Sequence, residues 1–297
     1  MNRRAFLTSL SAAAGASCLP MASRAWADAA FTSDRIAVRT TGSGPDVIMV
    51  PGLTSSPRIW EVAIAATPGY RYHLVQLNGF AGLPVAGAAQ GQVVASAAEE
   101  IARYVTAAGL TRPALVGHSL GGDIALMIAA RHPALLSRIM IVDAMPWLGA
   151  VFSAPGATPE SVIPLARGME AGMAQATPEQ WRASMTQNVA GMVRTESRRP
   201  MIMEDGLASN PGVAGRAMAE LIVTDLRPEI GRITVPTTLL YAHGSRYPTT
   251  PEQTDALYRA QYANLPSARL IRIDGADHFI MLDQPARFAA ELASFLR

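Results

Sequence analysis

The chain has 297 residues, of which 49% are hydrophobic and 16% are charged. This composition supplies enough apolar side chains for a large buried core, and it excludes a disordered chain. The formal net charge is +2, and all 25 basic residues are arginines scattered along the sequence. Because they form no basic stripe, nucleic acid is not an expected partner. The single cysteine, Cys18, excludes an intramolecular disulfide and a cysteine-rich metal site.

Residues 1–27 have the pattern of an export signal. Arg3 and Arg4 precede an alanine-rich apolar run, and Ala25-Trp26-Ala27 matches a small-residue cleavage site. The paired arginines resemble a twin-arginine signal, and the apolar run is shorter than a membrane span. We therefore expect export by the twin-arginine machinery, a periplasmic or secreted location, and no stable membrane anchor in a mature chain that begins near Asp28.

Removal of this segment would change both the charge and the cysteine content. It takes away three arginines, Cys18 and no acidic residue. The remaining 22 basic and 23 acidic residues give a net charge of −1. A mature chain without cysteine suits an oxidising compartment.

Beyond the leader, short β-branched runs alternate with alanine-rich helical stretches. Strands are predicted at residues 46–50, 71–77, 114–117, 138–143, 237–243 and 268–274, and helices at 93–108, 121–131 and 285–297. This alternation predicts an α/β fold, with a mostly parallel central sheet and helices on both faces. Residues 147–226 contain no convincing strand, are rich in methionine, and have Thr-Pro-Glu helix starts at Thr158 and Thr177. They predict a helical cap inserted into a core of residues 28–146 and 227–297.

The segment Gly117-His118-Ser119-Leu120-Gly121-Gly122 stands between a predicted strand and a predicted helix. It is a G-x-S-x-G pattern in the strand-turn-helix context that the pattern requires. A nucleophile at the tip of a tight turn needs glycines two residues away on either side, because Cβ atoms would collide there. Ser119 is therefore the predicted nucleophile, and the helix N-terminus after it would lend positive potential.

A serine nucleophile needs a base, which must be one of five histidines. His278 follows the last predicted strand and its turn, so its loop should open at the same carboxyl edge of the sheet as Ser119. The other histidines fit this role less well: His118 adjoins Ser119 on the strained turn, His73 and His243 belong to strands, and His132 ends a helix.

From residue 34 to residue 297 the chain resembles the α/β-hydrolase superfamily, in particular its serine esterases and lipases. The matching segments are VIMVPGLTSSPRIW, NGFAG, LVGHSLGG, RIMIVDAMP, VPTTLLYAHG and IDGADHFIMLDQP. The resemblance implies an oxyanion hole formed by two backbone N–H groups, those of Leu53 and Leu120. Pro51 stands where many relatives have histidine, and this does not disturb a main-chain donor at Leu53.

The acid of the implied triad departs from the usual family pattern. The family usually places an aspartate after the penultimate strand, where this chain has Tyr247 and no carboxylate before Glu252. A second family solution places the acid after the strand that follows the nucleophile helix, and Asp143 stands there. We expect Asp143 to orient His278 and to stabilise its charged form. The alternative acids are Asp225, Asp255 and Asp277, and Asp143 would then only organise the hinge of the cap.

The cap is also expected to supply the substrate pocket. Its methionines, together with Trp147, Phe152 and Trp181, predict an apolar cavity over the nucleophile. The alternative interpretation is that these side chains only pack the cap against the core.

The predicted function is hydrolysis of an ester of a small, largely apolar molecule, through attack by Ser119 and an acyl-enzyme. One alternative is hydrolysis of a C–C bond or a lactone by the same residues. The other is a hydrolase-like binding protein that has lost catalysis. The sequence contains no metal-binding cluster or nucleotide loop, so no cofactor is implied.

Overall fold

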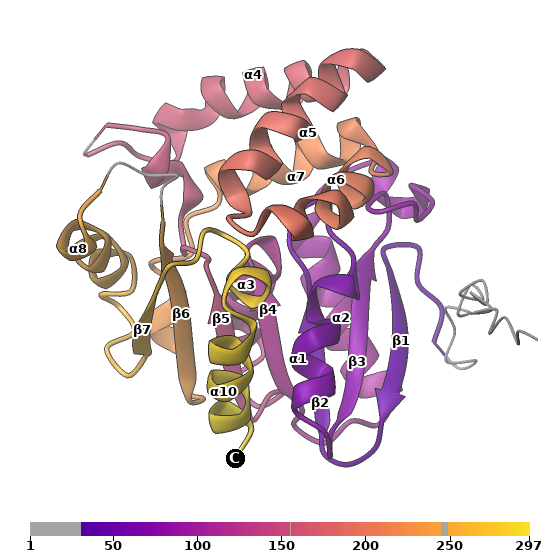
Figure 1. Cartoon of the computed structure of the whole chain (residues 1–297), viewed down its shortest axis with the longest axis vertical. Helices are drawn as coiled ribbons and strands as arrows, with labels where there is room; N and C mark the ends of the chain where they lie inside the picture. The colour runs from indigo at the N-terminus through magenta and orange to yellow at the C-terminus, as the bar shows by residue number, and fades with distance from the viewer. Residues whose placement is uncertain (1–30, 155, 245–248) are drawn as a thin grey trace, which may run out of the picture.

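The computed structural model describes residues 31–154, 156–244 and 249–297, and the predicted export segment lies outside these residues. Its seven-stranded sheet has the order β1-β3-β2-β4-β5-β6-β7 (Figure 1). β1 pairs antiparallel with β3, and every other pair is parallel. The strands are β1 (Ile36–Gly42), β2 (Asp46–Val50), β3 (Arg71–Leu77), β4 (Ala114–His118), β5 (Arg138–Val142), β6 (Thr237–His243) and β7 (Arg269–Asp274). The predicted fold class is confirmed.

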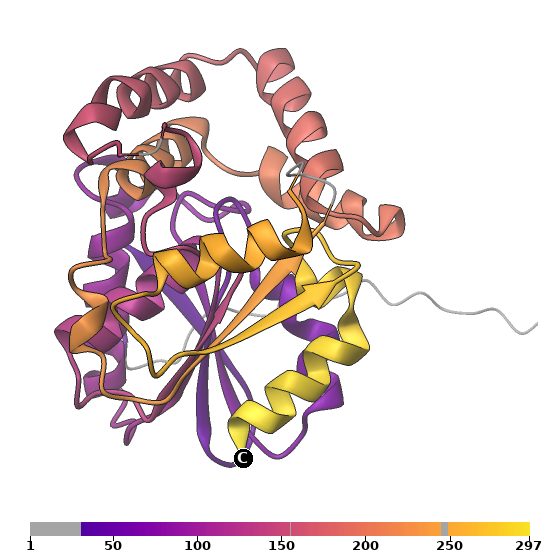
Figure 2. The ribbon, with the colours of Figure 1, turned by 90° about the vertical axis from the view of Figure 1, so that its left-hand side faces the viewer.

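Helices cover both faces of the sheet, as Figures 1 and 2 show. The helices are α1 (Glu61–Ala66), α2 (Val94–Ala107), α3 (Leu120–Arg131), α4 (Ile163–Ala174), α5 (Pro178–Met192), α6 (Arg199–Leu207), α7 (Pro211–Val223), α8 (Pro251–Gln261), α9 (Ile280–Asp283) and α10 (Pro285–Leu296). α1 and α10 pack on one face, whereas α2 and α3 pack on the other.

The central strands are buried on both faces, which explains why they are continuous apolar runs in the sequence. In β2, Val47 and Met49 point toward α1 and α10, whereas Ile48 and Val50 point toward α2 and α3. All four side chains are at most 1% exposed. This burial fixes the register of β2, because a shift by one residue would exchange the two faces.

Between β5 and β6 the described residues form helices and no strand. In Figures 1 and 2, α4 to α7 lie above the edge of the sheet at which the parallel strands end. We call these four helices the cap helices. α5 begins where the sequence predicts, with a capping box in which Thr177 accepts the N–H of Gln180. Thr158 instead precedes a short 3₁₀ turn, and α4 begins only at Ile163.

Carboxylates of the cap helices bind backbone groups of the core. Glu220 of α7 accepts the N–H groups of Val93, Val94 and Ala95, at 2.7, 2.9 and 2.8 Å, where α2 begins. Asp205 of α6 accepts both the N–H and the hydroxyl of Ser56, at 2.9 and 2.6 Å. Both side chains are buried. The cap helices are therefore held on the sheet by charge-assisted hydrogen bonds as well as by apolar contacts.

Candidate active site

Ser119 lies in the sharp turn between β4 and α3. Its backbone has φ 53° and ψ −123°, a conformation that residues other than glycine rarely adopt. The surrounding main chain holds this conformation: the N–H of Ser119 donates to Val142 O at 2.9 Å, and its carbonyl accepts from Gly122 N at 2.6 Å. The backbone of the turn is strained and is held by main-chain hydrogen bonds, which is the backbone geometry of a nucleophile elbow.

The glycines around Ser119 are required by close backbone approaches. A Cβ atom at Gly117 would collide with the carbonyl oxygen of Gly121, and one at Gly121 would collide with the carbonyl oxygen of Val50. A Cβ atom at Gly122 would lie 2.6 Å from the Cβ of Ala144. The steric reason for the glycine spacing in the sequence pattern is therefore present in the structure.

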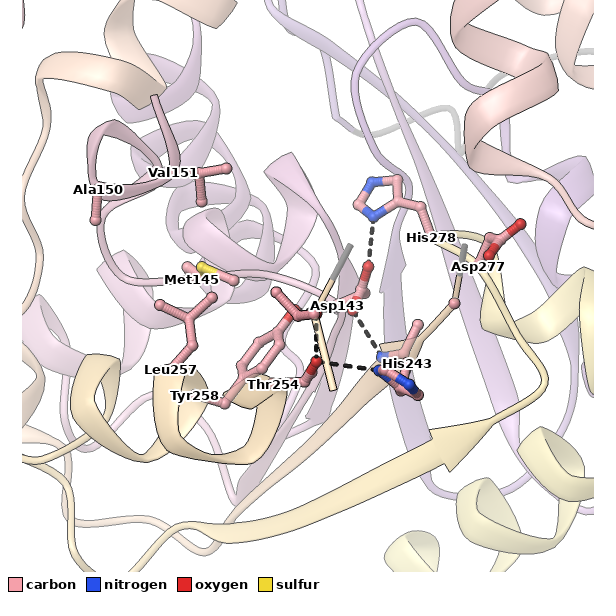
Figure 3. A pocket seen from close by; sticks show the side chains of 13 residues that line it. Asp143, Met145, Ala150, Val151, His243, Thr254, Leu257, Tyr258, Asp277 and His278 are labelled. Carbon is pink, nitrogen blue, oxygen red and sulfur yellow. Dashed lines mark hydrogen bonds and ion pairs between the residues drawn. The ribbon is translucent and has the colours of Figure 1, made fainter. Parts of the chain in front are cut away.

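Two of the three predicted triad residues are joined by a hydrogen bond. His278 follows β7, Asp143 follows β5, and Nδ1 of the histidine lies 2.6 Å from Oδ2 of the aspartate (Figure 3). The other carboxylate oxygen of Asp143 accepts the backbone N–H of Ala242 and the hydroxyl of Tyr258, both at 2.9 Å. Asp143 is thus fixed from three directions, and its oxygen atom orients the imidazole so that Nε2 faces away from it.

The alternative acids bind other groups. Asp255 accepts the hydroxyl of Tyr241 at 2.8 Å and pairs with Arg272 at 2.8 Å, and burial together with this carboxylate raises the pKa of Tyr241 to about 12. Asp225 pairs with Arg227 at 2.7 Å. Asp277 is buried, and Figure 3 shows its carboxylate turned away from the ring of His278.

The other histidines also have partners away from the nucleophile. His73 contacts Tyr104 and Asp46, His132 contacts Glu99, and His243 contacts Thr254. His118 is fully buried, and its Nε2 donates to the carbonyl oxygen of His278 at 3.0 Å. Burial, with a smaller effect of the nearby His278, lowers the pKa of His118 well below its usual value. His118 is therefore a neutral donor that supports the main chain of His278.

The two residues implied as oxyanion donors lie in segments that adjoin the turn of Ser119. Leu120 is the first residue of α3, where an N–H group has no acceptor within the helix. Leu53 lies in the loop after β2, the strand next to β4. This loop approaches the nucleophile closely, because an ideal Cβ on Gly52 would lie 3.0 Å from the Cβ of Ser119.

A pocket of about 260 Å³ opens beside His278 and Asp143. Figure 3 shows its apolar wall, which Met145, Ala150, Val151 and Leu257 form. The residues from α8 are Thr254, Leu257 and Tyr258, which have the i, i+3, i+4 spacing of one helix face. Sequence reasoning missed these residues, although this spacing is visible in the sequence.

The aromatic residues that were expected to line a cap pocket do not line this one. Trp147 is 3% exposed and donates its indole N–H to Ile222 O, and Trp181 is 5% exposed and donates to Gly206 O. Both indoles therefore donate to carbonyl groups of the cap helices α6 and α7, in agreement with the packing interpretation. Phe152 is 42% exposed at the surface.

Among the described residues there is no group of three or more His, Cys, Asp or Glu side chains that could hold a metal ion. No helix in this part of the chain is both long enough and apolar enough to cross a membrane.

A sequence model of the alpha/beta hydrolase family matches residues 47–291, which is most of the chain. This chain belongs to the alpha/beta hydrolase family. A pimeloyl-[acyl-carrier protein] methyl ester esterase from Aeromonas hydrophila is 27% identical over 266 residues, which cover 88% of this chain and 99% of the relative.

Solved structures share the fold at lower identity. A hydrolase from Pseudomonas aeruginosa PA01 superimposes with a TM-score of 0.75 at 19% identity, covering 93% of this chain and 99% of that one. A thermophilic esterase from Thermogutta terrifontis has a TM-score of 0.72 at 19% identity, covering 88% and 93% of the two chains. These hydrolases show that the fold extends over nearly the whole described chain.

Proposed function

We propose that this chain is a serine hydrolase that cleaves carboxylic esters of small, largely apolar molecules. The observation that carries the proposal is the 2.6 Å hydrogen bond between His278 and Asp143, at the same sheet edge as the strained turn of Ser119. An aspartate on Nδ1 leaves Nε2 of the histidine as the proton acceptor, which is the arrangement that activates a serine.

In the proposed reaction, His278 takes the hydroxyl proton while the Ser119 oxygen forms a bond to the ester carbonyl carbon. The backbone N–H groups of Leu53 and Leu120 stabilise the resulting oxyanion. His278 then gives the proton to the alcohol oxygen as the C–O bond breaks, which leaves an acyl-enzyme. Water, deprotonated by His278, attacks the acyl-enzyme, and the carboxylic acid leaves as Ser119 regains its proton.

The relatives support ester cleavage in particular. The curated relative from Aeromonas hydrophila is named for a methyl ester, and it matches this chain over nearly all of its own length. Because its identity of 27% is low, the relative supports the reaction type and not the pimeloyl-[acyl-carrier protein] substrate.

The test is labelling with a fluorophosphonate, which reacts only with an activated serine. We expect the wild-type chain to be labelled, and to hydrolyse p-nitrophenyl acetate, whereas Ser119→Ala and His278→Ala should do neither. A folded wild-type chain that remains unlabelled would instead favour a binding protein without catalysis.

We also propose that residues 1–27 direct export through the twin-arginine machinery, on the basis of Arg3-Arg4 and the Ala25-Trp26-Ala27 site. The test is fractionation of bacteria that express the full chain. We expect a shortened protein outside the cytoplasm, and full-length protein inside it for the double variant Arg3→Lys and Arg4→Lys. Export of that variant at the wild-type level would contradict the proposal.

A further inference from the structure

The pocket beside His278 lies on one side of the nucleophile. Its lining residues come from the ends of β5 and β6, from the 3₁₀ turn Leu148–Val151 that follows β5, from α8 and the residues before it, and from the loop after β7. In the sheet order β2-β4-β5-β6-β7, these elements lie on the side of β4 opposite to β2. The loop that carries Leu53 follows β2. The pocket and the implied oxyanion donor at Leu53 are therefore on opposite sides of Ser119.

This position decides which part of an ester the pocket can hold. In the tetrahedral intermediate, the oxyanion must point toward Leu53 and Leu120, whereas the leaving oxygen must point toward His278, which protonates it. The alcohol part of the ester therefore extends toward the β5 and β6 side of the nucleophile. The pocket of about 260 Å³ opens there, and His278 is part of its wall.

The chemistry of the pocket wall favours an uncharged, apolar group. Met145, Val151 and Leu257 form its apolar side (Figure 3). The hydroxyl of Thr254 is already engaged, at 3.1 Å from Nδ1 of His243 and 2.9 Å from the hydroxyl of Thr249. The carboxylate of Asp143 is committed to His278, Ala242 and Tyr258. Asp277 also belongs to the wall, but it is buried and Figure 3 shows its carboxylate turned away from His278. Among the described residues the wall is therefore mainly apolar, which favours an uncharged group.

We propose that this pocket, which we call the alcohol pocket, binds the alcohol part of the substrate and selects uncharged apolar alcohols of about the size of benzyl alcohol. The volume of about 260 Å³ lies just below the range of about 300–1,000 Å³ that is typical of small-molecule pockets, so the occupant is a small group. The inference rests on the proposed function, because it assigns one half of the ester to a site beside the same histidine.

The experiment compares kcat/KM for benzyl acetate with kcat/KM for methyl acetate, two esters with the same acyl group and leaving groups of similar basicity. We expect the wild-type chain to prefer benzyl acetate by about tenfold or more. Leu257→Trp and Ala150→Phe, which fill the alcohol pocket, should each lower this preference about tenfold. The matched control is Leu165→Trp on α4. Leu165 and Leu257 have similar exposed fractions, 39% and 36%, but Leu165 does not line the pocket. The control should keep the wild-type preference.

A binding measurement separates this inference from the proposed function. Benzyl alcohol titrated into Ser119→Ala should bind saturably, and adding Leu257→Trp should weaken the binding about tenfold. One outcome is that Ser119 of the wild-type chain reacts with fluorophosphonate, but the ester preference is equal in all variants and benzyl alcohol does not bind saturably. This outcome refutes the alcohol pocket and leaves the hydrolase function standing. If Ser119 does not react, the proposed function fails and the assignment of the pocket fails with it.

Discussion

Ser119 and Asp143 share an unusual backbone conformation, since both have a positive φ, 53° and 50°, directly after a strand. Left-handed conformations are costly for residues with a side chain, so they persist only where the surroundings hold them. Here the N–H of each residue donates to the neighbouring strand, Ser119 to Val142 O and Asp143 to Leu240 O, at 2.9 and 2.8 Å. The chain therefore leaves β4 and β5 in the same way, with a positive φ that a hydrogen bond to the neighbouring strand holds.

The contacts of Asp143 lead to the first prediction. Asp143→Asn should keep the fold, because asparagine tolerates a positive φ and has the same size. It places an amide where the N–H of His278 needs an acceptor, so the histidine is no longer held in the tautomer that accepts the serine proton. We expect kcat for p-nitrophenyl acetate to fall by a factor on the order of 10⁴. The measurement is steady-state kinetics with circular dichroism as the check on folding.

Asp255→Asn is the matched control. Its carboxylate binds Tyr241 and Arg272 and has no contact with His278 among those that the structure shows, so kcat should stay within about twofold of the wild type. Full activity of Asp143→Asn together with loss of activity in Asp255→Asn would show that Asp255, and not Asp143, is the acid that orients His278.

The sequence predicted the residue types of the site but not their surroundings. Asp143 could be placed at a strand end from the pattern alone, whereas its hydrogen bond with Tyr258 joins residues 115 positions apart and depends on how α8 packs. The direction of an indole is equally invisible in a sequence. The indole N–H groups of Trp147 and Trp181 donate to backbone carbonyl groups of the cap helices. Neither side chain lines the pocket beside His278.

Glu220 joins α7 to the first turn of α2. The carboxylate satisfies three backbone N–H groups, and a negative charge at a helix N-terminus is favourable. Glu220→Ala leaves these buried donors without an acceptor, so we expect the free energy of unfolding to fall by about 2–4 kcal/mol. Urea denaturation measures this change. Glu204→Ala removes an exposed carboxylate from α6 and should cost less than about 1 kcal/mol. Equal losses in the two variants would contradict the role given to Glu220.

The loop that carries His278 is held by Asp283. This carboxylate accepts the N–H groups of Asp277, Arg194 and Thr195, at 2.9, 3.2 and 2.8 Å, and so ties the loop to the segment after α5. Asp283→Asn replaces an acceptor oxygen by a donor nitrogen and should loosen the loop. Because small displacements of a catalytic group are costly, we expect kcat to fall about tenfold with KM within twofold. A rise in KM with an unchanged kcat would show that Asp283 acts on substrate binding instead.

The strands differ in how far the sequence determines them. The structure places the six parallel strands within one residue of the predicted bounds. Among them, β2 and β5 are nearly continuous apolar runs, which are recognised most easily. β1 was missed. Only Ile36 and Val38 of this strand are buried, and the rest of it is exposed or half-buried at the sheet edge next to β3. The second half of β1, Thr40 to Gly42, is polar or small and exposed, so the alternation of apolar and polar residues is too short for recognition from sequence.

Two buried ionisable groups of the β4–α3 segment, His118 and Asp123, have opposite effects on how the stability of the protein depends on pH. Burial lowers the pKa of His118 well below its usual value, so the unfolded chain binds a proton below about pH 6.5 that the folded chain does not. Stability therefore falls as the pH falls through this range. Burial raises the pKa of Asp123 well above its usual value, so the folded chain keeps a proton that the unfolded chain releases above about pH 4. Stability then falls as the pH rises.

Asp123→Asn isolates the second effect. Asparagine has no proton to lose, so the variant lacks the decline in stability that Asp123 causes above the unfolded pKa, while the effect of His118 is the same in both chains. We expect the free energy of unfolding of the variant, minus that of the wild type, to be larger at pH 8 than at pH 5, as measured by urea denaturation at both values. Asp34→Asn, which changes an exposed carboxylate, should give the same difference at the two pH values. A difference for Asp123→Asn that does not grow with pH would mean that Asp123 is ionised in the folded chain throughout this range, and that the N-terminus of α3 compensates for its burial.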